Sequence, residues 1–248
     1  MQNEQNLQSE LYTEFDKDPT PITAFVAWLA DSYGLPQHLR VLDMGCGPGR
    51  MLAEYARLGW QVVGMEPDTD FYATARETVK HLDRVSLRRG GFTELDFENA
   101  FDLITAINNP FSYLLDISAR VEALGRVYRA LKPGGVFFLE LTNFLYKLQH
   151  FQPVTVQKKE VDGEAVIHMM EHRVDLHEAR WMLRDQYIVE GQPDVIEKQH
   201  EQAVITLPEL SYFLQEQGFT NIRTYASYCS RIAETASGEK ILIAAQKP

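Results

Sequence analysis

The chain has 248 residues, of which 45% are hydrophobic and 24% are charged. This balance is typical of a globular protein with its own core and excludes an intrinsically disordered chain. With 24 Lys and Arg against 35 Asp and Glu, the formal net charge is −11, which argues against a nucleic-acid partner because such binding depends on basic residues that neutralise phosphates.

We expect no export signal at the N-terminal end. Residues 1–10 are polar and acidic and lack the basic and apolar regions of a signal peptide. No apolar run in the chain approaches the roughly 18 residues of a membrane-spanning helix. Cys46 and Cys229 are too few for a disulfide framework and have no metal-ligand spacing. We therefore expect a cytoplasmic protein with no metal site, no membrane partner and no nucleic-acid partner.

The first part of the chain alternates helices with short apolar strands. Residues 1–19 predict a polar arm or short helix that carries Tyr12. Apolar spacing predicts helices over 20–33, 51–58, 70–80 and 117–131, and strands over 40–43, 61–65, 85–88, 101–107 and 136–141. Strands that alternate with helices form a parallel sheet, and ligands of such sheets bind beyond the carboxyl ends of the strands.

The alternation stops between residues 144 and 205. Period-two patterns in 166–172 and 181–189 predict an antiparallel β insertion with one solvated face. A helix over 208–217 and strands over 221–225 and 240–245 then complete the chain. The sequence thus predicts an α/β fold of three layers. It is a Rossmann-like, seven-stranded, mostly parallel sheet with a C-terminal antiparallel strand, and the insertion covers the ligand crevice.

A glycine loop follows the first expected strand, in the segment Asp43-Met-Gly-Cys-Gly-Pro-Gly49. Glycines at a strand-to-helix turn let the backbone approach a ligand closely, and the first N–H groups of the helix point at it. A dinucleotide fingerprint would need a third glycine where Arg50 stands. Asp43 would repel a pyrophosphate but suits a ligand with a cationic amino group.

Glu66 ends the second expected strand, 23 residues after Asp43. A carboxylate at this place can accept hydrogen bonds from both hydroxyls of a ribose. Together, the loop and Glu66 predict a ligand with a ribose and no diphosphate.

These motifs resemble those of the class I S-adenosylmethionine-dependent methyltransferases, specifically the small-molecule branch. The resemblance is close over about 40–140 and 206–248, and it is one of layout only over 1–39 and 144–205. It implies a cofactor-binding domain of residues 1–143 and 206–248, with 1–39 as arm and helix, and a substrate lid or homodimer surface of residues 144–205. It also implies that the chain moves a methyl group from S-adenosyl-L-methionine to an N or O atom of a small-molecule acceptor by in-line displacement.

The resemblance also assigns residues to the cofactor. Asp43 and the glycine loop would hold the methionine end, and Glu66 would bind the ribose hydroxyls. Phe92 would pack on the adenine ring, but Gly91 stands where the family commonly has an acid, so backbone or another residue must contact the adenine amino group. The expected cofactor-binding residues are Tyr12, Asp43, Gly45, Cys46, Gly47, Glu66, Pro67, Gly91, Phe92, Asn108 and Phe111.

The catalytic residues are left open, with His168, His172 and Asn108 as candidates. Asn108-Asn109-Pro110-Phe111 follows the fourth expected strand and partly matches the Asn-Pro-Pro-aromatic motif of amino-group methyltransferases, although Asn-Pro is also a common turn. His168 and His172 share one strand face and could supply a general base, or they are ordinary strand residues. Tyr12 could close over the cofactor or pack on the core.

Three other functions compete with small-molecule methylation. A nicotinamide-dependent oxidoreductase is disfavoured by the loop spacing and by Asp43. A non-catalytic S-adenosylmethionine-binding protein, acting in regulation or assembly, would keep the same loop. RNA or protein methylation is disfavoured by the net charge and by the expected lid.

Overall fold

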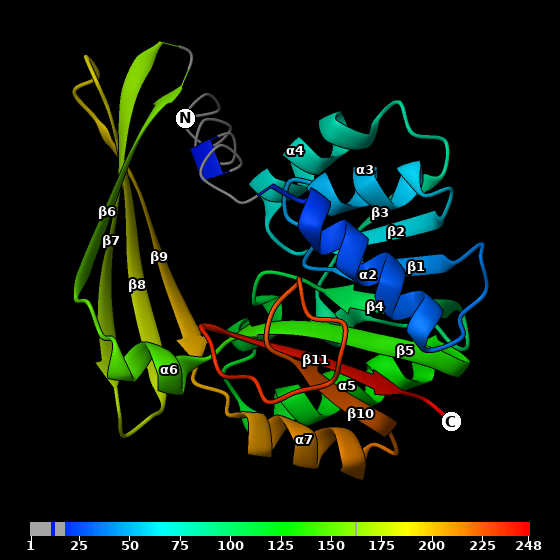
Figure 1. Ribbon diagram of the computed structural model, residues 1–248. Helices are drawn as coiled ribbons and strands as arrows, with labels where there is room; N and C mark the ends of the chain where they lie inside the picture. Colours follow the sequence, from blue (N-terminus) through cyan, green and yellow to red (C-terminus); the bar gives the residue numbers. More distant parts are fainter. Residues whose placement is uncertain (1–10, 13–17, 162) are drawn as a thin grey trace.

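The structure is a computed structural model that describes residues 11–12, 18–161 and 163–248. The other residues of the predicted N-terminal arm lie outside the described residues. The described residues form two sheets, a seven-stranded one flanked by helices and a four-stranded one that stands beside it (Figure 1). Among them, no helix is both long and apolar enough to cross a membrane.

The seven-stranded sheet has the strand order β10-β11-β5-β4-β1-β2-β3. Its strands are β1 (Arg40–Met44), β2 (Gln61–Glu66), β3 (Val85–Arg89), β4 (Phe101–Ala106), β5 (Leu131–Thr142), β10 (Thr220–Tyr225) and β11 (Lys240–Gln246). Neighbours among β1–β5 are parallel, whereas β11 is antiparallel to both β5 and β10. This confirms the predicted fold class, including the reversed strand at the end.

Helices cover both faces of this sheet. They are α2 (Thr20–Ser32), α3 (Arg50–Arg57), α4 (Thr69–Val79), α5 (Ile117–Ala130) and α7 (Leu207–Glu216), with short 3₁₀ turns η1 (Phe92–Glu94) and η2 (Pro110–Tyr113). Successive strand residues point to opposite faces, so Val41 packs with α2, α3 and α4 while Leu42 packs with α5 and α7. Each fully buried side chain of this kind contributes about 1.5–3 kcal/mol.

The four-stranded sheet is an antiparallel meander in the order β6-β7-β8-β9. Its strands are β6 (Val154–Val161), β7 (Glu164–Asp175), β8 (Arg180–Val189) and β9 (Val195–Ala203). In its register, Asp185 pairs with Lys198 and Leu183 with His200. The odd residues of β8 and the even residues of β9 therefore share the face that is turned toward the seven-stranded sheet (Figure 1).

Two elements differ from the prediction. Residues 144–149, expected to begin the β insertion, form a short helix, α6 (Phe144–Gln149), because the Asn143 side chain accepts a hydrogen bond from the Tyr146 N–H and caps it. Strand β5 begins five residues before the predicted 136, at Leu131. The turn at Gly134 and Gly135 exchanges backbone hydrogen bonds with Lys247 and so extends the pairing with the chain that follows β11.

Candidate functional site

The glycine loop lies between β1 and α3, where the carboxyl ends of β1 and β2 meet. The N–H groups of Gly45 and Cys46 both donate to the Met65 carbonyl, at 2.8 and 3.0 Å. Gly45 and Gly47 have φ values of +67° and +54°, which favour glycine. A Cβ on Gly47 would meet nothing within 4 Å, so the loop is open to a ligand above this residue.

Glu66 lies at the end of β2 with its carboxylate aimed across the loop. It is 5% exposed, and its oxygens accept hydrogen bonds from the N–H groups of Gly47 (2.8 Å) and Asp68 (2.9 Å). Burial raises the pKa of Glu66, while these two hydrogen bonds act in the opposite direction. Each oxygen keeps a lone pair for a further donor, so the carboxylate is fixed in place and can still bind hydroxyl groups.

Asp43 lies at the base of the loop, in β1. It is 2% exposed, and its Oδ1 accepts a hydrogen bond of 2.7 Å from the Thr105 hydroxyl. Burial raises the pKa of Asp43 to about 7; the Thr105 hydrogen bond opposes this rise and the nearby Glu66 carboxylate adds to it. A cation placed near this carboxyl group would favour its ionised form.

Replacing Asp43 with Asn should change how stability depends on pH. The folded-state pKa of about 7 lies above the unfolded value near 4, so ionising Asp43 lowers the free energy of unfolding as pH rises through this window. Between about pH 5 and about pH 8 this loss amounts to about 3 kcal/mol, and Asp43→Asn lacks it. Urea unfolding of both proteins at the two pH values measures this loss. The free energy of unfolding of the variant minus that of wild type should be larger at the higher pH than at the lower pH. A difference that does not change with pH would contradict the assignment.

The loop after β3 contains Gly91 and Phe92. The Gly91 N–H donates to the Glu94 carboxylate at 2.7 Å, and a Cβ on Gly91 would lie 3.9 Å from the exposed Pro67. Glu94 therefore brings an acid close to the position where the resembling family commonly has one. Sequence reasoning missed it, although an acid three residues after Gly91 was a visible signal. Phe92 is only 5% exposed and packs edge-to-face on Phe111.

The segment after β4 has two consecutive asparagines in the left-handed conformation, Asn108 and Asn109 (φ +67° and +69°). The Asn109 side chain accepts from the Thr142 N–H at 3.0 Å and donates to Gln202 of β9 at 3.1 Å, so it joins the two sheets. Asn108 is exposed, and its side chain donates to the Tyr12 hydroxyl. Phe111 is fully buried in the core and offers no surface to a ligand.

Tyr12 lies over the helix that follows Glu66. Its ring packs edge-to-face on Phe71 of α4, with centroids 5.1 Å apart. Together with the hydrogen bond from Asn108, this contact places Tyr12 between the segments after β2 and β4. Burial raises the pKa of Tyr12. Cys46, in contrast, points inward: burial raises the pKa of its thiol, and its sulfur would be 3.0 Å from a Cβ on Gly64.

The two candidate histidines of β7 have different surroundings. Both are 7% exposed. His172 Nδ1 accepts from the Trp181 indole N–H at 3.2 Å, and its Nε2 lies 3.4 Å from the Thr155 hydroxyl. Burial lowers the pKa of His172, so the ring is neutral with its lone pair occupied, which suits a structural role. His168 instead contacts Asp185 through Nε2, at 2.8 Å.

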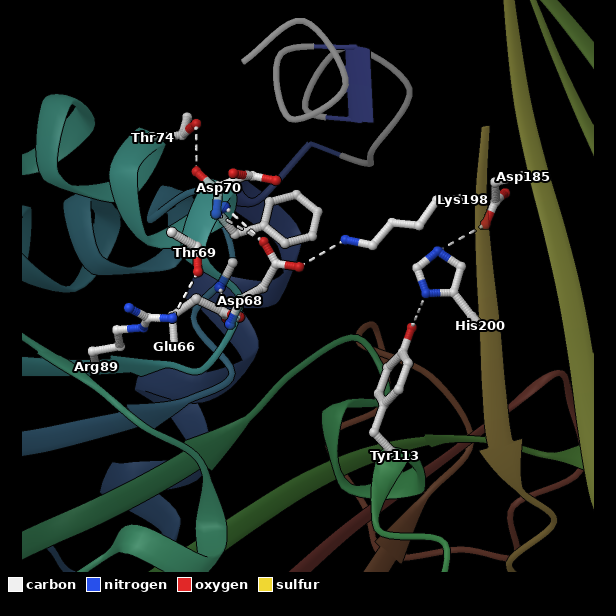
Figure 2. Close-up of polar contacts among 12 residues, drawn as sticks. Glu66, Asp68, Thr69, Asp70, Thr74, Arg89, Tyr113, Asp185, Lys198 and His200 are labelled. Atoms are coloured by element: carbon white, nitrogen blue, oxygen red, sulfur yellow. Dashed lines mark hydrogen bonds and ion pairs between the residues drawn. The ribbon is translucent and has the colours of Figure 1, made fainter. Parts of the chain in front are cut away.

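A hydrogen-bonded chain that sequence reasoning missed connects the two sheets (Figure 2). The Tyr113 hydroxyl, in η2, lies 3.2 Å from Nδ1 of His200, and Nε2 of His200 lies 3.2 Å from Asp185 Oδ2. The other Asp185 oxygen contacts His168. The signal was the alternation of β9, which places Lys198, His200 and Gln202 on one face.

An ion pair beside Glu66 also joins the sheets. Lys198 Nζ of β9 lies 2.8 Å from Asp68 Oδ2, and 5.0 Å from the centre of the Phe71 ring (Figure 2). Asp68 Oδ1 caps α4 by accepting from the N–H groups of Asp70 and Phe71. We call the region bounded by Tyr12, Asn108, Tyr113, Lys198 and His200 the inter-sheet junction.

Comparisons with known proteins agree with this arrangement. A family model described as a methyltransferase domain matches residues 41–135. A protein of Geobacillus sp. (strain WCH70), whose name gives a methyltransferase and no acceptor, is 24% identical over 230 residues, which are 90% of this chain and 91% of that protein.

Two solved structures share the fold over nearly the whole chain. An S-adenosylmethionine-dependent methyltransferase from Clostridium acetobutylicum ATCC 824 gives a TM-score of 0.81 at 17% identity, covering 97% of this chain and 98% of that one. An amino pentose methyltransferase from Micromonospora echinaspora, solved with S-adenosylmethionine bound, gives 0.76 at 20% identity, covering 98% and 97%. With this coverage, the shared fold includes the four-stranded sheet.

Proposed function

The chain is a member of the class I S-adenosylmethionine-dependent methyltransferases, and from this premise we propose that it methylates a nitrogen atom of a small molecule held at the inter-sheet junction. S-adenosyl-L-methionine is the methyl donor. A hydroxyl oxygen of a small molecule is the second candidate acceptor, because Tyr113 and His200 can also accept a proton from a hydroxyl group.

The residues at the carboxyl ends of β1 and β2 fit this cofactor. The open space above Gly47 admits a ligand backbone, the fixed Glu66 carboxylate suits two ribose hydroxyls, and the buried Asp43 suits an ammonium group. When bound, the cofactor supplies an electrophilic methyl group: the acceptor lone pair forms a bond to its carbon while the carbon–sulfur electron pair returns to sulfur. The protein then contributes positioning and exclusion of water.

One observation carries the choice of a small amine. Tyr113 follows β4, and three carboxylates, Asp185, Glu66 and Asp68, act on it electrostatically from both sheets. Burial raises the pKa of Tyr113, yet 47% of the residue is accessible, so it is surrounded by protein and still open to a ligand. Carboxylates around an accessible site favour a cationic acceptor. The fold neighbour that acts on an amino pentose supports the same class.

Methyl release assays test this proposal. The protein with S-adenosylmethionine is offered a panel of primary amines, including amino sugars, and the matching alcohols and phenols. We expect transfer to at least one amine and tight binding of S-adenosylhomocysteine, with no binding of NADH. Transfer to alcohols alone would favour the oxygen acceptor. Tight cofactor binding without transfer to any compound would favour a regulatory or assembly role, and salt-sensitive binding of tRNA would favour RNA methylation.

We further propose that the four-stranded sheet acts as a lid held by the Lys198–Asp68 ion pair. Lys198→Met should release S-adenosylhomocysteine about fivefold faster, because a partly exposed ion pair contributes about 1 kcal/mol. Stopped-flow displacement measures the rate. Lys158→Met, which removes an exposed lysine of β6, is the matched control. Equal release rates for wild type and Lys198→Met would show that the pair does not retain the ligand.

A further inference from the structure

We propose that Tyr113, His200 and Asp185 form a proton relay that deprotonates the acceptor before methyl transfer. The inference rests on the proposed function, because it requires an acceptor nitrogen that arrives as an ammonium ion. An aliphatic amine is protonated at neutral pH, as a lysine side chain is, and an ammonium nitrogen has no lone pair with which to displace a methyl group. An enzyme acting on such an acceptor therefore gains from a group that takes up this proton.

The hydrogen-bond partners assign the protons in the relay. Burial raises the pKa of Asp185, but hydrogen bonds from His168 and His200 outweigh it and hold the pKa at about 2, so Asp185 is a carboxylate that can only accept. His200 must then carry its proton on Nε2, which faces Asp185 Oδ2 at 3.2 Å. In the neutral ring Nδ1 is an acceptor, and the Tyr113 hydroxyl at 3.2 Å donates to it.

This assignment leaves the Tyr113 oxygen able to accept a hydrogen bond from the acceptor molecule. Its own proton points at His200 and its oxygen also takes a hydrogen bond from the Gln202 side chain, so one of its two lone pairs remains for a donor on the accessible side of the ring. The site is also directly after β4, in the segment that contains Asn108 and its bond to Tyr12. An ammonium group placed between Asn108 and Tyr113 can donate to the Tyr113 oxygen. Tyr113 is thus the catalytic residue, and His200 and Asp185 are positioning residues that act through it.

The proton transfer balances without any further reactant. The acceptor ammonium gives one proton to the Tyr113 oxygen, and the Tyr113 hydroxyl proton passes to His200 Nδ1. The products are a neutral amine, an unchanged tyrosine and a His200 imidazolium whose charge is paired with Asp185. The amine lone pair is then free to take the methyl group, and the imidazolium returns its proton to solvent.

Charged and titratable groups of three strands lie around His200. Asp185 of β8 contacts it directly, and His168 of β7 shares that carboxylate. Lys198, on the same face of β9, is itself paired with Asp68 next to Glu66. Within the described ranges no group of three or more His, Cys, Asp or Glu side chains is arranged to hold a metal ion.

The pH dependence of methyl transfer tests the relay. With the amine panel and saturating S-adenosylmethionine, Tyr113→Phe and His200→Gln should lower kcat about hundredfold near neutral pH. The deficit should shrink as pH rises, because more of the acceptor then arrives as the free amine. Affinity for S-adenosylhomocysteine should not change. His177→Gln, in the exposed turn between β7 and β8, should behave as wild type. A deficit that is constant over pH, or unchanged kinetics, would overturn the relay.

A second measurement needs no acceptor and separates the relay from the proposed function. In ¹⁵N NMR spectra of the histidine-labelled protein with S-adenosylhomocysteine, His200 should carry its proton on Nε2. The Nδ1 resonance should shift in Tyr113→Phe because its hydrogen bond is lost. A proton on Nδ1 with a bare Nε2 would overturn the relay. Failure of wild type to methylate any amine would instead contradict the proposed acceptor class, whatever the NMR result.

Discussion

Glu66→Gln is expected to weaken the binding of S-adenosylhomocysteine about hundredfold. Both Glu66 oxygens already accept from backbone N–H groups, of Gly47 and Asp68. An amide NH₂ would place a donor against one of these donors and would remove the negative charge that the ribose hydroxyls meet. Hydrogen bonds to a charged group contribute about 1.5–3 kcal/mol each, so weakening two of them costs about 3 kcal/mol, which is about two orders of magnitude in Kd.

Isothermal titration calorimetry with S-adenosylhomocysteine measures this effect. The matched control is Glu77→Gln, which removes an exposed carboxylate of α4 that pairs with Lys80. The control should leave Kd unchanged. If Glu66→Gln bound within threefold of wild type, roughly 0.7 kcal/mol, the ribose would not be bound by Glu66.

Gly45→Ala is expected to lower the free energy of unfolding by about 2–5 kcal/mol. The residue has φ +67°, a conformation that costs a residue with a Cβ about 1–2 kcal/mol. The added Cβ would also lie 2.5 Å from Pro110 Cβ and 3.1 Å from its Cγ. Proline is held rigidly by its ring, so the loops after β1 and β4 must move apart, which adds about 1–3 kcal/mol.

The same substitution at Gly59 separates the two contributions. Gly59 has φ +81°, but a Cβ there would meet nothing within 4 Å. Gly59→Ala should therefore lose only the conformational part, about 1–2 kcal/mol. Urea unfolding of the two variants and wild type gives the comparison. Equal losses at the two positions would mean that Gly45 and Pro110 are not packed together in solution.

The fold was accessible from sequence because local patterns agreed with the tertiary structure. Alternating apolar strands and amphipathic helices predicted β1 to β5 to within a few residues, and the period-two pattern predicted the four-stranded sheet. The two elements that differ from the prediction depend on individual contacts that the hydrophobic pattern does not encode. Helix α6 depends on one capping side chain, Asn143, and the early start of β5 depends on the pairing of Leu131 with Phe101 of β4, which precedes it by 30 residues.

The candidate site also has one part that the sequence predicts and one part that it does not. Asp43, the glycine loop and Glu66 belong to consecutive strand ends of a parallel sheet, so their spacing in sequence is enough to predict that they meet. Tyr113, Asp185 and His200 come from three separate elements, and they meet only because of the β8–β9 register and the docking of one sheet against the other. No local spacing specifies that docking.

The net charge of the sequence indicated the class of partner to exclude, but it did not indicate where the acidic residues gather in the structure. The net charge of −11 led us to expect no nucleic-acid partner, and it gave no position for the acids. The structure gathers Asp43, Glu66 and Asp68 near the glycine loop and Asp185 on the facing sheet. Of these four, Asp43 and Glu66 have raised pKa values through burial, whereas hydrogen bonds lower the pKa of Asp68 and Asp185 despite burial.

A crystal structure with S-adenosylhomocysteine bound tests the central claim most directly. We predict that both ribose hydroxyls lie within hydrogen-bond distance of the Glu66 carboxylate, that the amino acid part lies over Gly47, and that the sulfur faces the junction between Asn108 and Tyr113. A ribose placed away from Glu66, or a sulfur that faces away from Tyr113, would contradict the account of both the cofactor site and the acceptor site.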